Sequence, residues 1–311
     1  MDIGYKKGYS AAIFHTIITG LSFLFGKIAL ESSNPLDILA YRYAVAFLGV
    51  IIFFIFKPVK LNYTKENIFK ILPLTILYPL LFFSFQTFGL QYTSSSEAGI
   101  FLAMVPILTL IMADIFLKEK TTLLQKISIL LSVIGVIYIT LMKGSNLGFS
   151  NIKGIVFLII STLAYSGYNV LARNLTKEFT SIELSYMMIT ISFISFNLLS
   201  IIRNLLYGTI SNYFLPLQNL RFTIAIIYLG ILSSLISSLL SNYALSKIKA
   251  SEMSVFANLG TVISILAGVI FLKEKVFYYH IIGSILIIGG VLGTNFLDKI
   301  DLKDIQDALK K

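Results

Sequence analysis

Ten long apolar runs follow one another along the chain, and short polar segments separate them. They cover about residues 9–30, 36–56, 68–89, 96–117, 124–142, 153–173, 182–206, 222–245, 252–272 and 277–297. The hydrocarbon core of a bilayer is about 30 Å thick, so a helix needs about 20 apolar residues to cross it. The runs are continuous rather than alternating, which argues against a membrane β-barrel. The pattern predicts an all-α, polytopic membrane protein with ten transmembrane helices.

The chain also carries an internal repeat, which is best sought before any motif. At an offset of 155 residues, the sequence Phe-Leu-Lys-Glu-Lys at 116–120 recurs at 271–275. At an offset of 146 residues, Asp37 aligns with Glu183. The nine-residue difference between the offsets falls in the longer loop near 207–221. Identical charged residues at the same place after an apolar run indicate a duplicated unit.

Each half of the chain contains five predicted helices. Because five is odd, the second half enters the membrane with the opposite polarity. We therefore expect a first five-helix repeat over residues 1–148, a second, inverted repeat over 149–297 and a cytoplasmic tail over 298–311. Many secondary transporters are built from inverted repeats, with the substrate site near the bilayer midplane between them.

The composition agrees with a membrane location and excludes a soluble protein. Apolar residues make up 57% of the chain and charged residues 13%, against about 45–50% and 25% in soluble domains. The mean hydropathy is +0.87. The absence of cysteine excludes disulfides and cysteine-ligated metals. The basic residues behind the net charge of +10 lie in short loops, so we expect no nucleic-acid partner.

The distribution of basic residues predicts the orientation, because cytoplasmic loops are enriched in lysine and arginine. With a cytoplasmic N-terminus, 17 of the 25 lysines and arginines fall in cytoplasmic segments and six in outer loops. We therefore expect both termini in the cytoplasm and the protein in the cell (inner) membrane. The first run is longer than a signal-peptide core of about 7–15 residues and no cleavage site follows it, so we expect it to be retained.

Several short motifs resemble those of one transporter family. They are Asn34-Pro35-Leu36 with Arg42-Tyr43, and Gly89-Leu90-Gln91-Tyr92-Thr93 with Ser96-Glu97-Ala98, Pro106 and Glu119. Over about residues 8–297 the chain resembles EamA-type carriers of the drug/metabolite transporter superfamily. The resemblance implies ten helices, two inverted five-helix repeats, and a central cavity for a small metabolite. The second repeat departs from the pattern, with Met188 and Thr261 in place of Arg42 and Pro106.

Polar side chains are costly inside a bilayer, so those within the predicted spans are candidates for substrate binding. On the first span they recur at helical spacing, and the offset of 146 places polar or small residues at the matching positions of the sixth span. Close helix packing or lipid contact is the alternative for the small and aromatic residues. The candidate substrate-binding residues are His15, Thr19, Ser22, Phe23, Tyr78, Phe82, Gln86, Phe101, Tyr165, Tyr168, Asn169, Ser237 and Asn258.

Four further assignments concern coupling, gating and structure. His15 is the candidate for proton coupling, since it lies near the middle of its span and histidine titrates near neutral pH; a packed histidine is the alternative. Arg42 is a candidate for gating or helix anchoring, with snorkelling to the interface as the alternative. Glu97 is expected to cap its helix. Pro106 is carried over from the family resemblance as a gating or structural residue.

We therefore expect a secondary transporter, acting as an exporter of a small polar or amphipathic metabolite such as an amino acid. It would work by alternating access at a midplane cavity. A passive facilitator or channel of the same fold is the alternative, with a membrane-embedded enzyme as a more distant one. The chain lacks common catalytic and nucleotide-binding motifs, so no catalytic residue, metal or cofactor is expected. The expected partners are a small-molecule substrate and the lipid bilayer; proton coupling and oligomeric state stay open.

Overall fold

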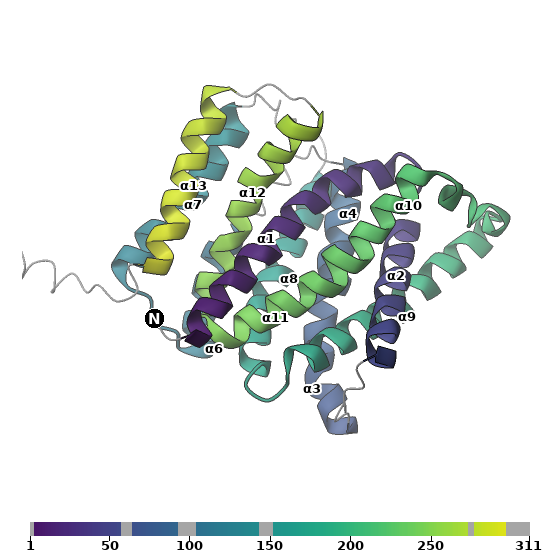
Figure 1. Cartoon of the computed structure of the whole chain (residues 1–311), viewed down its shortest axis with the longest axis horizontal. Helices are drawn as coiled ribbons and strands as arrows, with labels where there is room; N and C mark the ends of the chain where they lie inside the picture. The colour runs from purple at the N-terminus through teal and green to yellow at the C-terminus, as the bar shows by residue number, and fades with distance from the viewer. Residues whose placement is uncertain (1–2, 57–63, 93–103, 143–151, 273–276, 297–311) are drawn as a thin grey trace, which may run out of the picture.

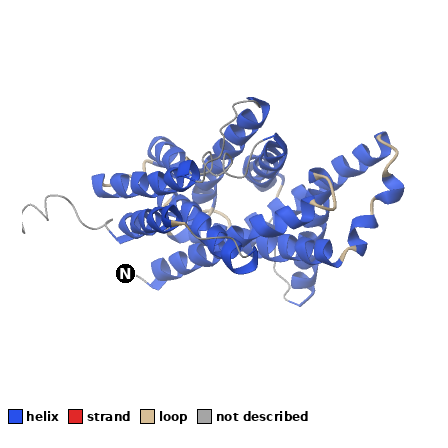
Figure 2. Cartoon of the chain, turned by 90° about the horizontal axis from the view of Figure 1, so that it is seen from above, coloured by secondary structure: helices blue, strands red, loops and turns tan. Residues whose placement is uncertain are grey.

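The computed structural model describes residues 3–56, 64–92, 104–142, 152–272 and 277–296. These residues form helices joined by short loops, with no strand among them (Figure 2). The elements are α1 (Ile3–Leu30), α2 (Pro35–Phe56), α3 (Lys65–Thr75), η1 (Ile76–Leu81), α4 (Phe82–Tyr92), α6 (Val105–Leu117), α7 (Leu123–Met142), α8 (Ile152–Leu175), α9 (Ser181–Leu206), η2 (Ile210–Asn212), η3 (Leu215–Gln218), α10 (Leu220–Ile227), η4 (Tyr228–Ile236), α11 (Ser237–Lys247), α12 (Ala250–Leu272) and α13 (Tyr278–Phe296).

The helices have the length and polarity of membrane spans. Six helical stretches are long and apolar enough to cross a bilayer, namely 4–30, 35–56, 65–89, 152–175, 181–206 and 220–247. Large apolar side chains such as Phe56 (84% exposed) cover the outside, whereas Ser185, Ser192 and Ser200 of α9 are buried. The prediction of an all-α, polytopic membrane protein is confirmed. The described part of each predicted run contains a helix, and the count of ten spans stays a prediction.

The helices pack as two pairs at the edges of the molecule and a central group between them. α7 and α13 lie side by side at one edge of the molecule, and α2 and α9 pack together at the other (Figure 1). Between them, α1 packs on α11 and α12, and α8 packs on α4 and α6. The α7–α13 contact is close: a Cβ atom on Gly290 would lie 2.5 Å from the carbonyl oxygen of Ser128 and 2.6 Å from the amide nitrogen of Ser132.

The third predicted span is an interrupted helix. Between α3 and α4, η1 is π-helical and the backbone of Tyr78 is extended, with φ −143° and ψ 122°. The residue before a proline is disfavoured in the helical region, and Pro79 follows Tyr78. The eighth span contains a similar π-helical segment, η4, without a proline. π-Helical segments are rare and are often found at functional sites.

The connection between α9 and α10 covers one end of α2. Gly208 follows α9 with φ +66°, a conformation that favours glycine. The hydroxyl of Tyr41 on α2 donates to the carbonyl of Tyr213, and their rings lie 5.0 Å apart. Burial raises the pKa of the Tyr213 hydroxyl above its ordinary range. This connection fixes the end of α2 to the second half of the chain.

Candidate substrate site

Five aromatic side chains meet where the interrupted helix packs on α8. Tyr78, Phe82, Phe83, Tyr165 and Tyr168 form this group, which we call the aromatic cluster. The ring of Tyr78 lies 4.5 Å from that of Tyr168 and 5.3 Å from that of Phe82. Phe82 and Tyr165 are 4.8 Å apart. Four of the five were predicted as substrate-binding residues, and the structure brings these four together.

The aromatic cluster is joined to α11 by hydrogen bonds. The hydroxyl of Tyr168, which is fully buried, lies 3.0 Å from Ser241 Oγ and 3.1 Å from Asn242 Oδ1. The amide of Asn242 in turn donates to Ser185 Oγ on α9 at 2.9 Å. Polar groups from α8, α9 and α11 therefore satisfy one another beside the rings.

Asn169 follows Tyr168 on α8 and is a buried polar residue whose side chain has no hydrogen-bond partner among the described residues. Its side chain is 1% exposed, and neither Nδ2 nor Oδ1 forms a hydrogen bond with any described residue. Thr109 Oγ1 on α6 is buried and unpaired in the same way. A buried amide or hydroxyl without a partner costs about 1–3 kcal/mol. Such groups suit the polar part of a bound molecule.

Thr109 and Asn169 lie at a similar height along the two neighbouring helices α6 and α8. At the start of α6, the carbonyl of Val105 accepts a hydrogen bond of 3.4 Å from Ser166 Oγ on α8. At the other end, Arg173 Nε lies 3.4 Å from Glu119 Oε1, just beyond α6. The two helices therefore run in the same direction. The unpaired threonine and asparagine come four and three residues after the first contact, about one helical turn further along.

Arg42 borders the aromatic cluster on the α2 side. Its side chain is buried, and its guanidinium carbon lies 4.0 Å from the centre of the Phe83 ring. Nε donates to Ser234 Oγ at 2.6 Å, and Nη2 donates to the carbonyl and hydroxyl oxygens of Ser233 at 3.2 and 3.1 Å. Arg42 therefore links α2 to the π-helical segment η4 and does not snorkel to the membrane interface.

The predicted polar face of α1 makes contacts of a different kind. His15 Nδ1 lies 2.9 Å from Ser237 Oγ and 3.1 Å from the Ser237 carbonyl, which joins α1 to α11. The hydroxyls of Thr19 and Ser22 donate to carbonyls of their own helix. Within the described part of the chain, no hydrogen bond joins His15, Thr19 or Ser22 to the aromatic cluster.

The remaining predicted residues are dispersed. Gln86 is buried on α4, one turn beyond the aromatic cluster. The amide of Asn258 on α12 donates to Ser132 Oγ on α7 at 3.0 Å, so it is placed against the α7–α13 pair. Pro106 lies in the first turn of α6, where the missing amide costs no helical hydrogen bond. Glu97, Phe101, the side chain of Phe23 and the tail at 298–311 lie outside the described residues.

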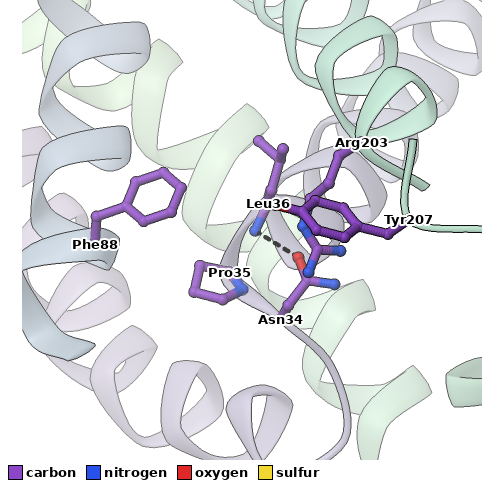
Figure 3. Close-up of a pocket in the computed structure, with 6 residues that line it drawn as sticks. All are labelled: Asn34, Pro35, Leu36, Phe88, Arg203 and Tyr207. Carbon is purple, nitrogen blue, oxygen red and sulfur yellow. Dashed lines mark hydrogen bonds between the residues drawn. The ribbon is translucent and has the colours of Figure 1, made fainter. Parts of the chain in front are cut away.

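A pocket opens where α2 begins, and it faces α4 and α9. Its volume is about 360 Å³ and it is lined by Asn34, Pro35, Leu36, Phe88, Arg203 and Tyr207. Figure 3 shows Phe88 on one side and Arg203 with Tyr207 on the other, beside the bond from the Leu36 amide to Asn34. The Arg203 guanidinium lies 5.3 Å from the Tyr207 ring and 4.0 Å from Asp37. The pocket thus combines a cation with aromatic walls.

Two carboxylates are buried in networks outside the aromatic cluster. Asp37 accepts hydrogen bonds from Ser200 Oγ and Asn204 Nδ2 on α9. Glu252, at the start of α12, accepts from the hydroxyls of Tyr5 and Tyr9 on α1 at 2.8 and 3.1 Å. No group of three or more histidine, aspartate or glutamate side chains among the described residues could hold a metal ion.

Sequence reasoning did not select Phe83, Ser233, Ser234 or Asp37 as site residues. Phe83 gave no signal of its own, since it is one of several consecutive apolar residues. The contact of the two serines with Arg42 depends on the rotation of η4, which has no proline to mark it. For Asp37, the one available signal was a carboxylate near the start of an apolar run.

The comparisons with known proteins show the family of this chain and the likeness of its fold to a solved structure. The sequence model of the EamA-like transporter family matches residues 6–141 and again 152–296. The chain is 46% identical to the uncharacterized transporter YcxC of Bacillus subtilis, over 92% of each protein. It is 29% identical to an uncharacterized transporter of Archaeoglobus fulgidus, over 88% of this chain and 92% of that protein. One crystal structure of another protein is 15% identical and has a TM-score of 0.75, over 93% of this chain and 99% of that chain.

Proposed function

Because the chain belongs to the EamA-like transporter family, we propose that it is a secondary carrier of a small polar or amphipathic metabolite, such as an amino acid. The observation that carries the proposal is the aromatic cluster beside Asn169, an unpaired amide in the interior of a membrane protein. Rings provide an apolar surface for a ligand, and a few polar groups fix its orientation. The proposal includes no enzymatic activity.

Alternating access requires two halves that move against each other, and three observations support the proposed inverted repeats. The family model matches the chain twice. The offset of 155 residues places η1 (76–81) on residues 231–236, within η4. The offset of 146 places Asn34 and Asp37 on Thr180 and Glu183, and in both halves the first residue of the pair caps a helix through its side chain. We place the substrate between the two irregular segments.

We propose that the protein lies in the cell (inner) membrane with both termini in the cytoplasm. It is supported by the concentration of lysine and arginine in the segments assigned to the cytoplasm. Export is the proposed direction of net transport. The alternative is a passive facilitator of the same fold.

Counterflow in proteoliposomes tests the carrier function. The purified protein is reconstituted, and uptake of radiolabelled leucine, phenylalanine and threonine is measured with and without the same amino acid inside. A carrier exposes one site alternately to each side, so uptake of its substrate should saturate and should accelerate when the inside is loaded. Uptake that stays linear with concentration and ignores internal substrate would establish the facilitator instead. Protein-free liposomes give the background.

We further propose that His15 couples transport to protons, on the basis of its burial and its contact with Ser237 across the α1–α11 interface. His15→Gln keeps the size and hydrogen bonding of the side chain but does not titrate near neutral pH. Transport driven by an imposed pH gradient should be lost, while counterflow is retained. His280→Gln, at the only other histidine of the chain, is the matched control. If His15→Gln leaves driven transport intact, His15 is a packed polar residue.

A further inference from the structure

Arg42 carries a positive charge deep within the helical bundle. It is the eighth residue of α2, about 10 Å from the start of the helix by the rise per residue. Its side chain is 6% exposed. A charged side chain at this depth is costly in a membrane, and such residues face the protein interior and serve a function or a partner.

The hydrogen-bond partners of Arg42 are neutral. They are the hydroxyl of Ser234 and the hydroxyl and carbonyl oxygens of Ser233. Arg173 and Arg203 each lie within 4.0 Å of a carboxylate, Glu119 and Asp37 respectively. In the part of the chain that the structure describes, Arg42 has no such ion pair. Hydroxyls and carbonyls solvate a guanidinium, but they do not neutralise its charge.

This uncompensated charge stands at the edge of the aromatic cluster. The guanidinium packs on Phe83 at 4.0 Å, and Phe83 lies 5.2 Å from Tyr78 and 4.8 Å from Phe82. On α8, the buried and unpaired Asn169 directly follows Tyr168 of the same cluster. One region of the protein interior therefore offers a cation, a set of flat rings and a free amide.

We propose that Arg42 binds the anionic group of the transported substrate, a carboxylate on a small organic acid whose apolar part packs on the aromatic cluster. The proposal rests on the carrier function proposed above and narrows its substrate class. A guanidinium presents its donors in a plane that matches a carboxylate. The amide of Asn169 supplies hydrogen bonds to a second polar group of the same molecule.

The second repeat has no equivalent of this cation. At the offset of 146, Met188 corresponds to Arg42, and its sulfur accepts a 3.6 Å hydrogen bond from Asn242. The proposed site therefore has a cation from the first repeat and none at the aligned position of the second repeat. This asymmetry favours a substrate with a single anionic group and disfavours neutral or purely cationic metabolites. A lipid headgroup is disfavoured because Arg42 is buried inside the bundle.

Ligand-induced stabilisation of the purified, full-length protein tests the proposal, because a molecule that binds only the folded state raises its melting temperature. The probes are benzoate, phenylacetate, L-phenylalanine and L-leucine, each compared with its own amide. Sodium phosphate at equal ionic strength tests for a general anion effect. Unfolding is followed by size-exclusion chromatography after heating. At least one carboxylate should raise the melting temperature above the value given by its amide.

Arg42→Met, which installs the residue of the second repeat, should weaken binding of that carboxylate at least tenfold. Arg42→Lys keeps a positive charge but loses the planar guanidinium, so it should weaken binding less than Arg42→Met. If Arg42→Met does not fold, the carboxylate affinity of Arg42→Lys tests whether Arg42 binds the carboxylate. Arg221→Gln removes an exposed arginine and should leave binding unchanged. A purely structural Arg42 would lower the melting temperature without ligand yet preserve the ligand-induced rise.

The proposal is overturned if no carboxylate exceeds its amide, if phosphate gives the same rise, or if Arg42 variants bind the carboxylate as the unmodified chain does. These outcomes are separate from failure of the carrier function. Counterflow of a neutral solute that is unaffected by Arg42→Met would leave the carrier intact and refute the anion site. Carboxylate binding that depends on Arg42, without any counterflow, would instead refute the carrier.

Discussion

Gly290→Leu is expected to separate α7 from α13 and to lower the free energy of unfolding by about 3 kcal/mol or more, since overpacking of a close contact typically costs 1–3 kcal/mol. A Cβ atom at this position would lie 2.5 Å from the Ser128 carbonyl oxygen and 2.6 Å from the Ser132 amide nitrogen. Both neighbours are backbone atoms, which cannot move aside as a flexible side chain does. The melting temperature in detergent, followed by circular dichroism, measures the loss.

Gly289→Leu is the matched control for this substitution. Gly289 is the preceding residue of α13 and is exposed, and the neighbour that its Cβ would meet is Leu131 Cδ2 at 3.8 Å. A leucine there would face lipid in the proposed arrangement, so we expect little change in the melting temperature. Equal losses in the two variants would show that the α7–α13 contact is not the cause.

Asp37→Ala is expected to cost about 3 kcal/mol, because two buried donors lose their acceptor and each unsatisfied buried group costs about 1–3 kcal/mol. The Asp37 carboxylate accepts hydrogen bonds from Asn34, Ser200 and Asn204, and Arg203 lies 4.0 Å away. Without the carboxylate, the buried Ser200 and Asn204 lose an acceptor. Asp37→Asn keeps an acceptor and should cost less than alanine. Thermal unfolding of the purified variants measures the difference.

The second half of the chain supplies the control for Asp37. Glu183 stands at the aligned position, 146 residues later, and forms a capping box with Thr180 at the start of α9. Its hydrogen bonds with Thr180 are exposed, so Glu183→Ala should cost about 1 kcal/mol, as for other helix caps. The buried-network argument fails if the alanine variants at 37 and 183 lose the same stability.

The helical spans were predictable from the sequence because their signal is strong and local. Each apolar run predicted a helix, and the structure has a helix in the described part of each run. The break at Tyr78 was not predicted, although Pro73 and Pro79 are visible in the sequence, because prolines in membrane helices often leave the helix continuous. The π-helical segment η4 contains no proline, so nothing in the sequence distinguished it from a regular helix.

Helical spacing predicted which residues of the candidate site share one face of a helix, but not which residues of other helices they contact. Spacing by four placed Tyr78 and Phe82 on one face, and the repeat suggested Tyr165 and Tyr168; their rings meet in the structure. Asn258 was chosen because it lies near the duplicated Phe256 in a predicted span, and its amide is bonded to Ser132. Which neighbour a polar residue meets depends on the rotation of two helices about their axes, and a single sequence does not contain that information.

The packing of the α9–α10 connection on α2 has a consequence for the energetics of a duplicated protein. In a transporter built from two identical inverted halves, the halves would exchange conformations during the transport cycle. The inward-facing and outward-facing forms would then be related by two-fold symmetry and would have equal free energies. Here the contacts of Tyr213 with Tyr41 belong to a segment that is nine residues longer than its counterpart in the first half. If the chain works as the proposed carrier, its two access states are therefore expected to differ in free energy, so that the empty carrier spends more time open to one side of the membrane than to the other.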